Sequence, residues 1–191
     1  MKFSGLLTCL LICFTFVAEA QTLRGLDKSP MDMAYYPDDF AHDRKFAPAK
    51  VGDKVFARIT YSRPAKKERD VFGKLIPYGK VWRVGANEAT EIKFFTDATI
   101  QGKKIKAGVY SFYAIPNETE WTLIFNTDLD QWGAYSYKPE LDVLRVTAPV
   151  KKTEALVENL SIQFKNMKDN VKDSVLLIAW ENTLVEVPVS F

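Results

Sequence analysis

The sequence predicts an all-β protein, an antiparallel two-sheet β-sandwich with an irregular N-terminal arm. From Val55 onward, apolar and polar residues alternate with a period of two, the spacing of strands that bury one face. Turn-forming residues separate these segments too closely for the crossover helices of a parallel sheet. Residues 109–115 and 175–180 are apolar on both faces, which indicates strands covered on each side. Two packed sheets satisfy all of these patterns.

The N-terminus predicts a secretory signal peptide over residues 1–20. Lys2 precedes an apolar run from Phe3 to Val17, and the run ends at the small-residue cleavage site Ala18-Glu19-Ala20. It is shorter than the roughly 20 apolar residues that a membrane-spanning helix needs. We therefore expect an exported protein, located in the periplasm, in the cell envelope or outside the cell. Both cysteines, Cys9 and Cys13, fall in this segment, so the mature chain is expected to be cysteine-free.

Composition limits the partners. The formal net charge of the 191 residues is +2, with both signs mixed along the chain, which argues against nucleic acid as the main partner. No later segment is apolar enough to predict a transmembrane helix. Phosphate-binding and dinucleotide-binding motifs are absent from the sequence, and we predict no cofactor.

Residues 21–50 are the least periodic part of the chain and predict an irregular arm. Their apolar side chains are too many to remain in water, so we expect the arm to pack on the domain formed by residues 51–191. These side chains belong to Met31, Met33, Tyr35, Tyr36 and Phe40.

Four segments alternate strictly and predict half-buried strands: 55–62, 121–126, 159–164 and 185–190. The main interruption is the long loop of residues 63–80, in which Pro64 ends the preceding strand and residues 71–76 predict one short helical turn. Long ordered loops are frequent locations of functional residues.

Several strings along the chain resemble a family of secreted bacterial proteins, numbered twenty-nine eleven among the domains of unknown function. The most specific one is Trp82-Arg83-Val84-Gly85-Ala86-Asn87-Glu88-Ala89-Thr90. The others are residues 60–64, 72–73, 77–81, 107–110, 126–135 and 142–146. The resemblance covers nearly all of the expected mature chain. It implies a periplasmic or cell-envelope β-sandwich, and it supplies no functional residues.

The long loop and the segment after it concentrate polar and aromatic side chains into a candidate ligand-binding site. Gly85-Ala86 permits a tight turn, and a guanidinium beside aromatic and amide groups can hold carboxylates, phosphates or sugar hydroxyls. The candidate residues are Arg63, Tyr78, Trp82, Arg83, Asn87 and Glu88. In the structural alternative, Trp82 belongs to the core and Arg83 pairs with Glu88.

Two patterns resemble metal sites, although neither leads to a predicted metal. Asn126, Asp128 and Asp130 have the alternate spacing of calcium loops but lack the expected glycine and closing acid, and a turn capped by its own side chains is favoured. His42 would share a helical face with Asp38, yet one imidazole among surface carboxylates is more often a solvated charge cluster.

Trp132, Tyr135 and Tyr137 follow in a loop that contains Gly133. Exposed aromatic rings could stack on sugars. The favoured alternative is that they close one end of the sandwich as buried side chains.

These features lead to three hypotheses. The first is a non-catalytic binding or interaction domain for a small molecule, a glycan or an envelope protein. The second is a carboxylate-dependent, glycosidase-like hydrolase that uses Glu88 with Asp128 or Asp130, which would require a carboxyl separation of about 5 to 9.5 Å. The third is a structural envelope protein without a small-molecule site.

Overall fold

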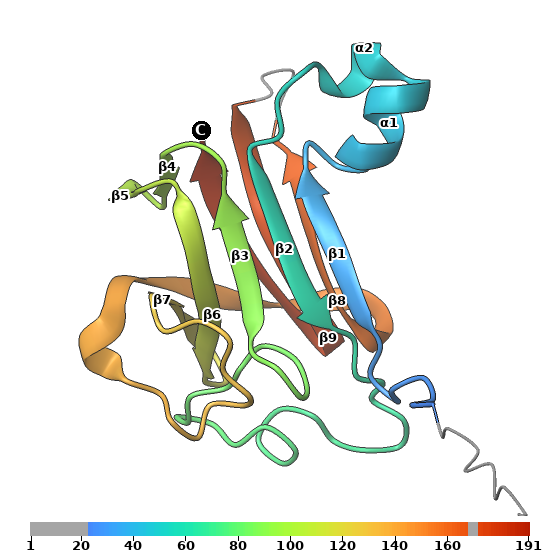
Figure 1. The fold of residues 1–191 in the computed structure, drawn as a ribbon. Coiled ribbons are helices and arrows are strands. Elements are labelled where there is room, and N and C mark those ends of the chain that lie inside the picture. The colour runs from blue at the N-terminus through green and yellow to red at the C-terminus, as the bar shows by residue number, and fades with distance from the viewer. Residues whose placement is uncertain (1–22, 168–171) are drawn as a thin grey trace, which may run out of the picture.

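The computed structural model describes residues 23–167 and 172–191 (Figure 1). The expected signal peptide lies outside the described residues. In the described part, nine strands form one sheet in the order β1-β2-β3-β6-β7-β8-β9-β4-β5, and all pairs are antiparallel. The strands are β1 (Met31–Tyr36), β2 (Ala57–Ser62), β3 (Thr90–Phe94), β4 (Ala98–Ile100), β5 (Lys103–Ile105), β6 (Gly108–Pro116), β7 (Glu120–Asn126), β8 (Asp142–Asn166) and β9 (Asp173–Ser190). The helices are α1 (Phe40–Phe46), α2 (Pro48–Val51) and the 3-10 helix η1 (Pro139–Leu141).

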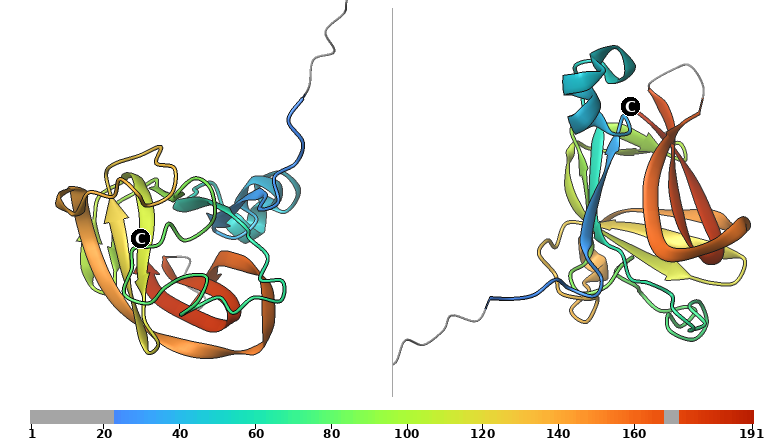
Figure 2. Two further views of the ribbon diagram at one scale, coloured as in Figure 1. Left: turned by 90° about the horizontal axis from the view of Figure 1, so that it is seen from below. Right: turned by 90° about the vertical axis from the view of Figure 1, so that its right-hand side faces the viewer.

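The antiparallel all-β prediction is confirmed, but two separate sheets are not. β8 belongs to both halves of the sheet, because its first part pairs with β7 up to Pro149 and its second part pairs with β9 from Val150 onward. This long strand curls, so that β8 and β9 lie opposite β1, β2 and β3 (Figure 2). One continuous sheet thus provides the two facing layers that the pattern of buried residues requires.

The curled sheet closes between the segment after β2 and the middle of β8. Ala65 and Asn159 form an antiparallel bridge. Beside it, the Lys66 amide donates to the Glu158 carbonyl at 2.7 Å, and the Leu160 amide donates to the Pro64 carbonyl at 3.1 Å. These bonds satisfy backbone groups that an open sheet edge would leave unpaired.

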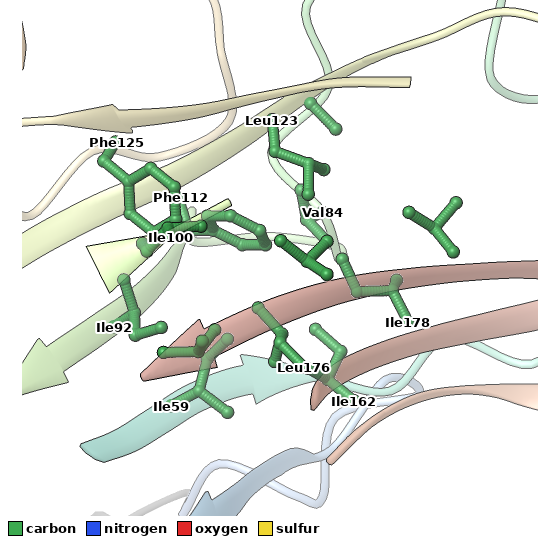
Figure 3. Packing of buried hydrophobic residues seen from close by; sticks show 14 of the residues in the cluster. Ile59, Val84, Ile92, Ile100, Phe112, Leu123, Phe125, Ile162, Leu176 and Ile178 are labelled. Atoms are coloured by element: carbon green, nitrogen blue, oxygen red, sulfur yellow. The ribbon is translucent and has the colours of Figure 1, made fainter. Parts of the chain in front are cut away.

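The main core fills the space between the facing layers (Figure 3). Ile59, Ile92 and Phe112 approach it from one layer, and Ile162 and Ile178 from the other. The predicted alternation is therefore confirmed in these strands.

A second, smaller cluster covers the opposite face of β6 and β7, with Tyr113 and Ile124 packed under Tyr137. This cluster explains why residues 109–115 are apolar on both faces. For residues 175–180 the same prediction is only half right, because Val175, Leu177 and Ala179 are half-exposed.

The N-terminal arm is more regular than predicted. β1 is a full edge strand paired with β2, with a register from Met31 opposite Ser62 to Tyr36 opposite Ala57. Two short helices follow it. The predicted helical turn at residues 71–76 is also wrong, since Phe72 and Ile76 form a tight bridge there. Nowhere in the described ranges is there a helix with the length and apolar character to cross a membrane.

Candidate functional site

Trp82, one of the predicted binding residues, belongs to the core. Its side chain is buried, it pairs through its backbone with Ala114, and its indole Nε1 donates to the Gly85 carbonyl at 3.1 Å. The ring packs against Trp121 and Trp180 and against Phe72 from the long loop. A ligand cannot reach this ring, so the structural alternative is correct for Trp82.

Arg63 is occupied by the closure of the sheet. Its Nε donates to the Leu160 carbonyl at 3.1 Å, its Nη1 to the Asp32 carboxylate at 2.8 Å, and its Nη2 to the Ser161 hydroxyl at 3.0 Å. All three nitrogens join strands that are distant in sequence. Arg63 therefore stabilises the closure of the sheet, and its predicted role in ligand binding stays a prediction.

Tyr78 lies on the long loop, where its ring covers Gly73. A Cβ atom at Gly73 would come within 2.8 Å of the Tyr78 ring, so the glycine permits this contact. Burial raises the pKa of the Tyr78 phenol, and the charges of Glu118 and Glu181 add to that effect. These neighbours place Tyr78 beside the β6–β7 turn and β9, and none of them is a predicted binding residue.

The segment between Trp82 and Thr90 is held in an unusual conformation. Val84 has a φ of 52°, which is rare and costly for a β-branched residue. Its side chain lies in the core (Figure 3), and its carbonyl accepts a hydrogen bond from the Thr90 hydroxyl at 2.7 Å. Gly85 approaches Ser62 so closely that a Cβ atom would lie 2.8 Å from the serine Oγ. The loop is therefore fixed on both sides.

Arg83 lies between Trp82 and Val84, whose side chains belong to the core. It is half-buried, and its Nε atom is buried without a hydrogen-bond partner. Burial lowers the pKa of the Arg83 guanidinium, while the nearby Tyr135 acts in the opposite direction. The expected pair with Glu88 is not formed. Arg83 is thus a partly desolvated cation to which the described residues offer no anion.

Asn87 and Glu88 connect this loop to the loop that follows β7, and both loops lie at one end of the sheet (Figure 1). Glu88 and Trp132 form an antiparallel bridge. The Gly133 amide donates to the Asn87 carbonyl at 2.8 Å, and the Ala89 amide donates to the Gln131 carbonyl at 2.8 Å. The two loops therefore behave as one small hydrogen-bonded unit.

The exposed rings of Trp132 and Tyr135 stack on each other and form what we call the aromatic platform of this unit. The side chains are 62% and 82% exposed, and the stacked rings have an interplanar angle of 12° and centroids 5.8 Å apart. Gly133, with a φ of 77°, lies against Tyr135, because a Cβ atom there would come within 2.7 Å of the ring. The expectation that these two rings are buried is wrong. Tyr137 is partly buried and packs edge-on against Tyr113.

A surface hollow lies beside the aromatic platform. Asn87, Glu88 and Trp132 line one side of it, and the extended coil 24–29 lines the other. The Asp27 carboxylate reaches across the hollow and accepts a hydrogen bond from Asn87 Nδ2 at 3.0 Å. The structure therefore brings two predicted residues, Asn87 and Glu88, together with an aromatic residue that had not been placed in the site.

A family model described as "Protein of unknown function (DUF2911)" matches residues 44–189. The chain belongs to this family. The match contains both loops of the candidate site and confirms the family suggested by the motif around Trp82. No curated protein and no solved structure matches the chain significantly. The DUF2911 region begins after β1, so the coil that forms the far side of the hollow lies outside it.

Within the DUF2911 region, the residues of the predicted calcium-like pattern stabilise a turn. Asn126 Oδ1 accepts the Asp128 amide at 2.8 Å, which is the turn that sequence analysis favoured. The Nδ2 atom of Asn126 donates a hydrogen bond to the Asp142 carboxylate, which also accepts hydrogen bonds from Tyr137 and Arg145. Burial raises the pKa of Tyr137 to about 12, and the hydrogen bond to Asp142 adds to this effect.

The other candidate acids are placed differently. Asp128 forms an ion pair with Lys138 at 3.0 Å, and the Asp130 amide contacts Glu91. His42 Nδ1 pairs with Asp43 at 2.8 Å and not with Asp38. Among the described residues, no group of three or more histidine or acidic side chains is arranged to hold a metal ion.

Proposed function

We propose that this protein is an exported, non-catalytic domain that binds saccharides on the aromatic platform of Trp132 and Tyr135. The main support for this proposal is that two nearly parallel aromatic rings are exposed on a loop unit that is fixed by hydrogen bonds. The apolar C–H face of a pyranose ring stacks on such rings, whose faces carry partial negative charge. A preformed platform also avoids the entropic cost of ordering the site upon binding.

Asn87 and Glu88 supply the polar part of the proposed site. They line the hollow beside Trp132, where an amide and a carboxylate can exchange hydrogen bonds with sugar hydroxyls. Asn87 already holds the Asp27 carboxylate at 3.0 Å, so its amide is oriented toward the hollow. Export follows from the signal-peptide pattern of residues 1–20.

Hydrolysis is less well supported than binding. Asp128, one of the two expected partners of Glu88, is held in an ion pair with Lys138, and neither Asp128 nor Asp130 lines the hollow with Glu88. A glycosidase needs two carboxyl groups that flank the same bond of the substrate.

Tryptophan fluorescence tests the proposed site directly. Trp82, Trp121 and Trp180 are at most 4% exposed, so acrylamide should quench mainly the emission of Trp132. A saccharide that binds on the platform should protect Trp132 from the quencher. Ligand at about 100 times its dissociation constant should also stabilise the fold by roughly 2.7 kcal/mol.

Two variants make the experiment decisive. Trp132→Ala should abolish binding as measured by calorimetry. Phe95→Ala, which removes another exposed aromatic ring just after the end of β3, should leave binding unchanged. Equal saccharide affinity of Trp132→Ala and the wild type would refute the proposal, as would a broad panel of envelope saccharides that leaves Trp132 fully accessible to acrylamide.

A further inference from the structure

Arg83 is a cation for which the fold provides no counter-ion. Its buried Nε makes no hydrogen bond, and no ion pair joins the guanidinium to an acid in the described ranges. Arg63 and Arg145, by contrast, each bond to a carboxylate. Buried donors in proteins almost always have partners, and an exception requires an explanation. The accessible part of the half-buried side chain can bind an anionic ligand, which would supply the missing counter-charge to the guanidinium.

The backbone that carries Arg83 is fixed on both sides. Trp82 on one side exchanges two hydrogen bonds with Ala114, at 2.7 and 2.9 Å, and the Arg83 carbonyl accepts the Thr90 amide at 3.1 Å. On the other side, Val84 is held at its positive φ by the Thr90 hydroxyl. Strain that is maintained in this way is typical of functional sites. The backbone position of the half-buried Arg83 is therefore set before any ligand arrives.

Arg83 and Glu88 border different parts of the aromatic platform. Arg83 lies near Tyr135, whereas Glu88 is bridged to Trp132 and lines the hollow. A sugar that stacks on an outer face of this ring pair would thus have a positive group on the Tyr135 side and a negative group on the Trp132 side. The carboxylate of Glu88 repels an anion on its own side, which leaves one orientation for a charged ligand.

We propose that the platform selects saccharides that carry a carboxylate, such as uronic acids, and that Arg83 binds the carboxylate while Glu88 accepts a hydroxyl of the same ligand. This inference rests on the proposed function. A single guanidinium matches the single charge of a carboxylate. A phosphate would bring up to two negative charges close to Glu88, of which Arg83 could neutralise only one.

Matched saccharide pairs test the inference. Each oligosaccharide that contains a uronic acid is compared with its carboxyl-reduced form, which has the same rings and linkages but no charge. Binding to the full mature chain is measured by calorimetry and by protection of Trp132 from acrylamide. The acidic member should bind about ten- to hundredfold more tightly, the factor expected for a charge-assisted hydrogen bond. Added salt should reduce this preference.

Arg83→Gln should bring the acidic and reduced members to similar affinity while stacking on Trp132 persists. Arg58→Gln removes a half-exposed arginine paired in register with Tyr35 and Lys93, and should keep the preference. If the reduced saccharides bind as well as the acidic ones, or if Arg83→Gln keeps the preference, the inference is wrong and the proposed function stands. If neither member of any pair protects Trp132, both are wrong.

Discussion

Arg63 and Arg83 carry the same group and were grouped together by their sequence context, yet the fold uses them differently. Arg63 lies where the curled sheet closes, and all three of its guanidinium nitrogens donate to groups of β1 and β8. Arg83 lies between two residues of the core, and its buried Nε donates to none of the described residues. Arg63 thus contributes hydrogen bonds that stabilise the fold, whereas the buried Nε of Arg83 contributes none.

The largest effect on stability is expected from Arg63→Met. This change leaves Asp32, Ser161 and the Leu160 carbonyl without their donor at the closure. Since Arg63 is partly exposed, we expect a loss of about 2–3 kcal/mol in the free energy of unfolding. Urea denaturation measures it, with an unchanged m-value as the sign that both end states are preserved. A loss below about 0.5 kcal/mol would contradict a structural role for Arg63.

A smaller loss is expected from Gly133→Ala, which tests how the aromatic platform is supported. The alanine must adopt a φ of 77° and displace the Tyr135 ring. The conformational part should cost about 1–2 kcal/mol. Gly102→Ala is the matched control, because Gly102 has a φ of 78° but open space around it. Both variants should lose similar stability, and only Gly133→Ala should change the near-ultraviolet circular dichroism of the platform. Identical spectra would indicate that Tyr135 does not depend on this glycine.

The third prediction concerns the base of the platform loop, where Tyr137 is bonded to Asp142 and Arg145. The pKa of Tyr137 is raised to about 12 from an unfolded value near 10. The folded state therefore holds this proton more tightly, and its stabilising contribution is complete below pH 10 and is lost as the pH rises toward 12. An absorbance titration at high pH should show late-ionising tyrosines, because burial also raises the pKa of other tyrosines such as Tyr61 and Tyr113, and Tyr137→Phe should remove one of them. If Tyr137→Phe left the late-ionising absorbance unchanged, Tyr137 would ionise near pH 10, which would contradict its hydrogen bonds with Asp142 and Arg145.

The smallest effect on stability is expected from Arg83→Met. Removing a half-buried cation without a partner should leave the free energy of unfolding unchanged or raise it by up to about 1 kcal/mol, because the desolvation cost disappears. The same urea experiment that is used for Arg63→Met measures it. A loss of more than about 1 kcal/mol would mean that Arg83 has a structural partner after all, and the contrast between the two arginines would vanish.

The sequence predicted most of the strands well because these bury one face, and the alternation of Ile59 and Ile162 with polar neighbours is a local property. It could not predict that β8 continues from one layer into the other, since both halves of that strand satisfy the same alternation. The second layer was therefore predicted as a separate sheet.

For the candidate site too, local patterns in the sequence were informative and long-range contacts were not predictable. The alternation of Trp82, Arg83 and Val84 carried a usable signal, because two apolar residues around a charged one place the charge on the opposite face. The role of Arg63 depends on a contact with Leu160 and Ser161 that no local pattern reveals. The exposure of Trp132 and Tyr135 depends on the turn at Gly133, and in a loop an aromatic residue gives no indication of which way it points.

The length of β8 also has a consequence for how the molecule comes apart. Because one strand carries the hydrogen bonds of β7 along its first part and those of β9 along its second, the two layers share a strand and are joined through it. Loss of this strand would deprive both layers of a neighbour at once, so unfolding should be cooperative across the whole domain. A protein divided at the middle of β8 would yield two fragments, each with half of a shared structural element and neither able to refold independently.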